Sequence, residues 1–179
     1  RTIQGPEMPD VMLVLGKGID VGPFFLTWGL LLMFALYFVV AWVLRNTAWG
    51  KHVYAVGDDP VAAQLSGINT NRVLFSVYLV AGLIMGITAL ITIGRVGSAS
   101  PNVDPMLNLQ SITAVVIGGI SLFGGRGAVV GSLIGATIVV AVEMGLSLVG
   151  VDQAYRTAAI GVLVIVAVGI DQWIRKVKV

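Results

Sequence analysis

The chain has 179 residues, of which 57% are hydrophobic and only 11% are charged, whereas a soluble domain carries about 25% charged residues. The mean hydropathy is +0.96. A water-soluble core of this size cannot enclose so much apolar surface, because small domains leave a large share of their surface exposed. The composition therefore predicts a protein whose solvent is lipid. The formal net charge of +2 gives no support to nucleic-acid binding.

The sequence contains no cysteine and a single histidine, His52, so it predicts neither a disulfide nor a metal site. No Gly-x4-Gly-Lys-Ser/Thr pattern occurs; the chain has no P-loop, and any ATP hydrolysis must come from another polypeptide. No Ser/His/Asp cluster indicates catalysis. We expect no cofactor and no enzymatic activity.

The elements predicted first along the chain are a loop and two membrane spans. Residues 1–22 mix Gly, Pro and Asp with apolar residues and predict a loop. The chain begins at Arg1 without a signal-peptide pattern, and we interpret it as a piece of a longer protein. The uncharged run 23–44 is long enough for the ~30 Å hydrocarbon layer. A second uncharged run lies between Arg72 and Arg95.

The polar stretch between these spans predicts a short amphipathic helix within 56–68. Asp59 followed by Pro60 is a helix start, Val61 and Leu65 belong to a small apolar face, and Gly67 is placed to end the helix. The residues assigned to this cytoplasmic helix are Asp58, Asp59, Pro60, Ala62, Ala63 and Gly67. The alternative is a connector on the membrane surface that binds no partner.

The next segment predicts a helix that begins at Asp104-Pro105, with Asp as N-cap and Pro in the first turn. Its apolar run, 106–117, is too short to span alone, so it is either broken or re-entrant, or it continues through Leu122. Four polar residues near its start are candidates for a polar pathway, although helix packing explains them equally well: Asn108, Gln110, Ser111 and Thr113.

The stretch 114–127 carries two Gly pairs around an Ile-Ser-Leu-Phe segment. Because glycine permits sharp turns and close backbone contact, a short helix with flexible ends can form a knob here. The alternative is close helix packing. Gly127, Gly131 and Gly135 recur every four residues, as do Gly82 and Gly86, a spacing typical of close helix contact in lipid, within one subunit or between two copies.

Two further apolar runs complete the chain. The run from 127 to 151 is interrupted by Glu143, and the last run covers 157–170. An acid at this depth either lines a pathway or meets the headgroups at the end of its span. Four or five membrane segments result, so residues 23–179 are predicted as one all-α, polytopic transmembrane helical bundle.

Positive charge predicts the orientation, since basic residues accumulate in cytoplasmic loops. One group falls on a single side if the segment after Pro105 is a crossing: Arg45, Lys51, Arg72, Arg126, Arg175, Lys176 and Lys178. We place this group and the C-terminus in the cytoplasm, and the loop 1–22 in the periplasm.

Two motifs carry a family resemblance. The first is GKHVYAVG at 50–57, followed by Ala62-Ala63 and by SGI at 66–68; the second is Gly-Gly-x-Ser-Leu-x-Gly-Gly-Arg-Gly at 118–127. In both, and in their order from about Leu44 onward, the chain resembles the ribose, xylose and fructose type of ABC-transporter permease. The resemblance covers only the C-terminal half of that family, whose members are nearly twice as long.

The resemblance implies a pore-forming subunit of the bacterial inner membrane, usually a homodimer in lipid, working with a cytoplasmic ABC ATPase and a periplasmic sugar-binding protein. It implies that the knob couples to the ATPase, with Ser121 and Arg126 in direct contact and the 56–68 loop beside it. The coupling residues are then Gly118, Gly119, Ser121, Leu122, Phe123, Gly124, Gly125, Arg126 and Gly127.

The substrate that the resemblance implies is a monosaccharide. The end of the chain, DQWIRK at 171–176, favours the fructose-like branch, whereas Glu143 departs from the uncharged residue expected in ribose-type members. Two alternatives remain open: a permease for branched-chain amino acids, and half of a gradient-driven secondary transporter, which would use intramembrane acids or broken helices.

Overall fold

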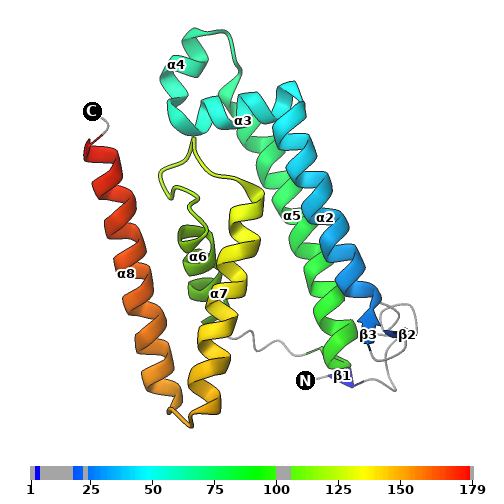
Figure 1. The fold of residues 1–179 in the computed structure, drawn as a ribbon. Helices are drawn as coiled ribbons and strands as arrows, with labels where there is room; N and C mark the ends of the chain where they lie inside the picture. Colours follow the sequence, from blue (N-terminus) through cyan, green and yellow to red (C-terminus); the bar gives the residue numbers. More distant parts are fainter. Residues whose placement is uncertain (1–2, 5–17, 22–23, 100–105, 178–179) are drawn as a thin grey trace. The chain divides into compact units, whose positions relative to one another are not determined.

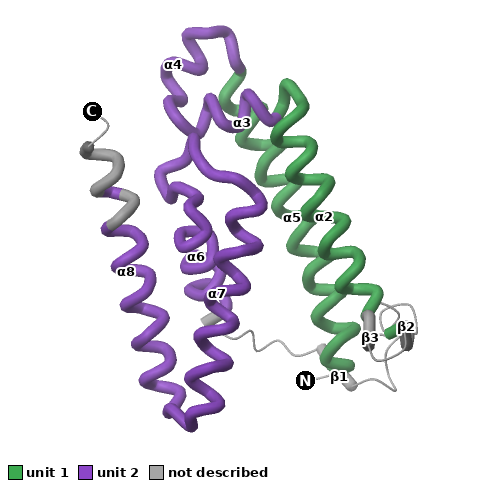
Figure 2. The backbone as a smooth tube through the Cα atoms, in the orientation of Figure 1, with its two compact units in different colours: residues 1–49, 69–103 green, residues 50–68, 104–179 purple. Residues whose placement is uncertain are grey.

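The computed structural model describes residues 3–4, 18–21, 24–99 and 106–177. Helices make up most of it, as the composition predicts, and four short strands pair in two ladders near the start of α2 and the end of α5. The chain separates into two compact units: Arg1–Trp49 with Asn69–Val103, and Gly50–Ile68 with Asp104–Val179 (Figure 2). We describe each unit by itself.

The first unit contains two long apolar helices, α2 (Trp28–Asn46) and α5 (Thr70–Val96) (Figure 1). Asn69 caps α5 through its side chain, which accepts a hydrogen bond from the Arg72 amide at 3.1 Å. The Trp49 indole donates to Ser76 Oγ at 2.7 Å and so ties the segment after α2 to α5. Both predicted spans in this half of the chain are therefore helices.

The strands change the predicted start of the first span. β2 (Gly18–Val21) pairs antiparallel with β3 (Phe24–Thr27), and β1 (Ile3–Gln4) pairs with β4 (Ser98–Ala99). Because the backbone of Phe24–Thr27 is bonded in a ladder, α2 begins at Trp28 rather than at residue 23. The rest of the predicted loop 1–22 lies outside the described residues.

The second unit is built on α6 (Met106–Ile117), α7 (Val129–Leu148) and α8 (Gln153–Val177), and α6 packs against both of the others (Figure 1). It also holds most of α3 (Ala48–Asp58) and all of α4 (Pro60–Leu65). The helix α6 ends at Ile117, so of the two alternatives left open for it, the one that continues it through Leu122 is wrong. The predicted cap at Asp104-Pro105 lies outside the described residues.

Backbone contact between α6 and α7 explains the small residues of both helices. A Cβ on Gly131 would collide with the carbonyl oxygen of Gly118, and a Cβ on Gly135 would collide with that of Ala114. Since 118 lies opposite 131 and 114 opposite 135, the two helices run antiparallel. The helix that fills the predicted groove at Gly131 and Gly135 is therefore α6 of the same chain, whereas no described atom lies within 4 Å of a Cβ built on Gly82 or Gly86.

Within the described residues, three helices are long and apolar enough to cross a membrane, namely α2, α5 and α7, and two shorter apolar stretches lie in α6 and α8. Their lengths of 19, 27 and 20 residues match the ~30 Å hydrocarbon layer at ~1.5 Å per residue. These helices indicate a membrane protein, in agreement with the four or five segments predicted from the sequence.

Candidate functional site: the glycine-rich loop and its support

The two motifs that carry the family resemblance lie in the second unit and contact each other there. The first contains α3, α4 and the turn between them. The polar stretch after the first span is thus more helical than predicted, since α3 was not expected. Trp49, Val53 and Val56 are spaced by four and three residues, and that period, which is helical, is the signal that could have revealed α3. Val56 is buried.

The short helix predicted after Asp59 is present as α4. The Asp59 carboxylate accepts hydrogen bonds from the amides of Val61 at 2.8 Å and Ala62 at 3.0 Å, which is the N-cap arrangement. Gly67 has φ +85°, a left-handed conformation that ends helices and favours glycine. The start and stop signals read from the sequence are confirmed.

The apolar face predicted for α4 is not the face of the helix that is buried. The residue of α4 that is buried is Ala63, whereas Val61 is 67% exposed and Leu65 85% exposed. Ala62 is exposed as well. The helix thus rests on its small residue and leaves its two large apolar side chains uncovered in this chain.

The glycine-rich segment after α6 is a compact loop and not the short helix of the knob, which was one of its two interpretations. The amide of Ser121 donates to the carbonyl oxygen of Arg126 at 3.1 Å and closes the loop, and the amide of Phe123 donates to Ser121 Oγ at 3.3 Å. The backbone turns at glycines with positive φ: Gly119, Gly124, Gly125 and Gly127. A right-handed helix does not accommodate these angles.

Three contacts fix this loop to the end of α3. The phenol of Tyr54 donates a hydrogen bond to the carbonyl oxygen of Gly127 at 2.9 Å. A Cβ on Gly57 would lie 2.7 Å from the amide nitrogen of Gly125, and a Cβ on Gly124 would collide with the carbonyl oxygen of Gly57. Backbone therefore lies directly on backbone where the two motifs meet, and glycine is required on both sides.

The tip of the loop presents an apolar pair and a cation. Leu122 is 47% exposed and Phe123 55% exposed, and the Arg126 side chain is exposed. Ser121, proposed with Arg126 for direct contact, is half-buried, and its hydroxyl accepts the Phe123 amide. Its structural role is to shape the loop.

The four pathway candidates on α6 differ in their surroundings. Asn108 and Ser111 are exposed, and the Ser111 hydroxyl donates to the carbonyl oxygen of Leu107 at 2.7 Å. Thr113 is fully buried and donates to the carbonyl oxygen of Leu109 at 2.6 Å. Gln110 donates to Glu143 on α7. Of these four candidates, Asn108 and Ser111 are therefore the two that are exposed.

Comparison with known proteins identifies the family of the chain. Residues 3–168 match the family described as the permease component of branched-chain amino acid transport systems. The match covers most of the 179 residues. The chain belongs to this permease family. Its members are described as permease components of transport systems, in line with the expectation of a transport subunit.

Relatives within the permease family are named for sugars. The fructose import permease protein FrcC of Rhizobium meliloti is 49% identical over 168 residues, 94% of this chain and 47% of the relative. The ribose import permease protein RbsC of Haemophilus influenzae is 36% identical over 166 residues, 92% of this chain and 50% of the relative. The galactose/methyl galactoside import permease protein MglC of the same organism is 37% identical over 138 residues, 76% of this chain and 41% of the relative.

The chain thus spans about half the length of the curated permeases that it matches. The resemblance to sugar permeases read from the two motifs is confirmed by these relatives. No solved structure matches the chain.

Proposed function

We propose that this chain is part of the membrane-spanning permease subunit of an ATP-binding cassette importer, and that the subunit carries a monosaccharide across the bacterial inner membrane. The identity of 49% with a fructose permease, against 36% with a ribose permease, favours a fructose-like sugar. The cytoplasmic partner in this proposal is an ABC ATPase, and the periplasmic partner is a sugar-binding protein. The subunit pairs with a second copy in the lipid bilayer.

The observation that carries the proposal is the junction of the two motifs. Segments about 70 residues apart in sequence meet through the Tyr54–Gly127 hydrogen bond and through the Gly57–Gly125 contact. Together they present the exposed side chains of Leu122, Phe123 and Arg126. An apolar pair beside a cation is suited to an acidic-rimmed apolar cleft, and we assign that cleft to the ATPase.

In the proposed mechanism, closure of the ATPase pair on ATP displaces the loop 118–127, which begins directly after α6 and leads into α7. Because α6 and α7 touch backbone to backbone at Gly118 and Gly131, they move together rather than sliding past each other. Transport is then a shift of population between two packings of the helices, with no chemistry on the sugar. Asn108 and Ser111 are the proposed pathway contacts of this chain.

The test of the transport class is uptake by liposomes that contain the complete subunit with its ATPase and binding protein. We expect labelled fructose to accumulate only with ATP on the ATPase side and to be unaffected when ion gradients are collapsed. Uptake that persists without ATP and stops with the gradient contradicts the proposal. Preferential uptake of leucine, with leucine held by the binding protein, shows a branched-chain amino acid permease instead.

The test of the coupling surface is the charge reversal Arg126→Glu. Repulsion at an acidic rim is expected to reduce the ATPase that co-purifies with the subunit by roughly tenfold, equivalent to ~1.4 kcal/mol. Arg72→Glu is the matched control, because Arg72 is also exposed but lies at the start of α5; it should leave the yield unchanged. Undiminished co-purification with Arg126→Glu contradicts the assignment of the loop.

A further inference from the structure

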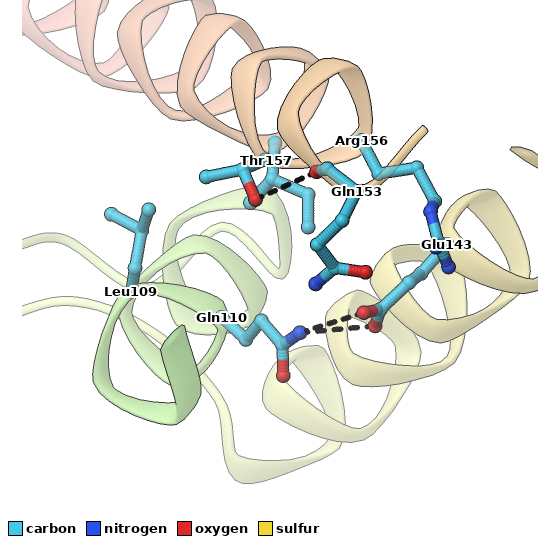
Figure 3. A pocket seen from close by; sticks show the side chains of 7 residues that line it. Leu109, Gln110, Glu143, Gln153, Arg156 and Thr157 are labelled. Atoms are coloured by element: carbon cyan, nitrogen blue, oxygen red, sulfur yellow. Dashed lines mark hydrogen bonds between the residues drawn. The ribbon is translucent and has the colours of Figure 1, made fainter. Parts of the chain in front are cut away.

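A small cavity, most of whose lining residues are polar or charged, lies where one end of each of α6, α7 and α8 meets (Figure 3). Its volume is about 10 Å³, which is room for roughly one water molecule and far too little for a sugar. The residues that line it are Leu109, Gln110, Glu143, Gln153, Arg156, Thr157 and Ile160.

Two of the residues around this cavity have hydrogen-bonding capacity that is not used. The Gln110 amide donates to both carboxylate oxygens of Glu143, at 3.1 and 3.0 Å, yet a carboxylate has about four acceptor positions. The Nε of Arg156 is buried, and among the described residues it has no hydrogen-bond partner. A buried donor without a partner costs about 1–3 kcal/mol. The residue with an unused acceptor, Glu143, and the residue with an unused donor, Arg156, therefore line the same cavity.

The charges of these two residues are opposite, and each is unfavourable alone in an apolar region. An isolated Asp or Arg in the middle of a membrane helix costs about 2.5–3.5 kcal/mol on insertion scales. Glu143 lies five residues before the end of α7, and Arg156 lies in the first turn of α8. The short turn between these helices brings the two residues to one cavity.

We propose that Glu143 and Arg156 form a charge-compensating pair, bridged by one water in this cavity, and that with Gln110 the pair fastens the start of α6 to α7 and α8. The water accepts a hydrogen bond from Arg156 Nε and donates one to the Glu143 carboxylate. Glu143 is then a counter-ion inside the helix packing, neither a sugar contact nor a headgroup contact. The proposal does not depend on which partner or sugar the subunit binds.

The consequence is that α6 is held near both of its ends. Gly118 lies against Gly131 at the end that leads into the loop, and Gln110 is bonded to Glu143 near the other end. A 12-residue helix fixed in this way cannot tilt independently of α7. The three helices therefore move as one body.

The test is a double-mutant cycle on the complete subunit, purified with its ATPase, with melting temperature and sugar uptake as the two measurements. Glu143→Gln and Arg156→Gln each leave one charge without its counter-ion, and each should lower the melting temperature by about 5 °C or more. The double variant is neutral and should recover more than half of the summed loss. Asp152→Asn is the control, because Asp152 is exposed, accepts from the Gln153 amide, and can be replaced by Asn in that bond; it should melt as the parent does.

Two results overturn the proposal. If the double variant loses as much as the two single variants together, the charges do not compensate each other. If Glu143→Gln abolishes uptake without changing the melting temperature, and Arg156→Gln changes neither uptake nor the melting temperature, Glu143 belongs to the pathway. If either single variant fails to assemble, the double variant decides. Assembly of the double variant supports the proposed pair, and failure of the double variant to assemble contradicts it.

Discussion

The phenol of Tyr54 donates a hydrogen bond to the carbonyl oxygen of Gly127, 2.9 Å away and 73 residues further along the chain. Tyr54 lies one turn before the end of α3, and Gly127 is the last glycine of the loop before α7. The same part of the loop touches the backbone of Gly57 and Asp58. The loop that carries the proposed coupling surface is therefore held in place by α3, through residues other than the exposed Leu122, Phe123 and Arg126.

Replacing Tyr54 by Phe tests that support. The Tyr54→Phe variant keeps the ring but removes the hydrogen bond to Gly127, at a cost of ~1 kcal/mol. Amide exchange in 118–127 should therefore accelerate about fivefold, since local opening follows the free energy of the segment. Hydrogen–deuterium exchange of the complete subunit, without the ATPase, measures this directly. The ratio of sugar-stimulated to basal ATPase activity should fall in the assembled transporter.

Tyr155→Phe is the matched control for this variant. Tyr155 belongs to α8 in the same unit and is 73% exposed, so loss of its hydroxyl should change neither the exchange nor the stimulation. Unchanged amide exchange of residues 118–127 in the Tyr54→Phe variant would mean that the glycine contacts alone hold the loop in place.

Local signals in the sequence predicted the elements that depend on local physics. The cap at Asp59, the stop at Gly67 and the long apolar helices all follow from neighbouring residues and run lengths. The helix α3 was missed because its polar residues suggested a loop, although Trp49, Val53 and Val56 keep a helical period.

Contacts between distant segments could not be predicted in the same way. Nothing near Gln110 or Glu143 indicates that they are bonded across 33 residues, and the buried state of Thr113 depends on the packing of α6 against α7 and α8. The glycine loop is an intermediate case. Its glycines permitted both a helix with flexible ends and a turn, and the positive φ angles of Gly124 and Gly125, where the loop meets Gly57, are those of a turn.

Substitution of Gly135 by Ala should separate α6 from α7. The added methyl group would collide with the carbonyl oxygen of Ala114 and lie 2.8 Å from the amide nitrogen of Gly118. Overpacking against backbone costs about 1–3 kcal/mol, so the melting temperature of the complete subunit should fall by roughly 2–10 °C.

Gly145→Ala on the same helix is the control for this change. No described atom lies within 4 Å of a Cβ built on Gly145, and Ala is the better helix former by about 1 kcal/mol in water. Its melting temperature should stay level or rise. Equal losses in the two variants would indicate that backbone flexibility of α7, rather than contact with α6, sets the stability.

The cap of α4 gives the last prediction. In the Asp59→Ala variant, the amides of Val61 and Ala62 lose their acceptor, at a cost of ~1 kcal/mol. A helix of six residues has little else to hold it, because helices this short are unstable on their own. Hydrogen exchange at 61–66 should accelerate about fivefold, while exchange in the long helices stays as before. Asp59→Asn should retain the parent's protection, because Asn caps as well as Asp does. Equally fast exchange in the Asn and Ala variants would mean that the charge of Asp59, rather than its hydrogen bonds, stabilises α4.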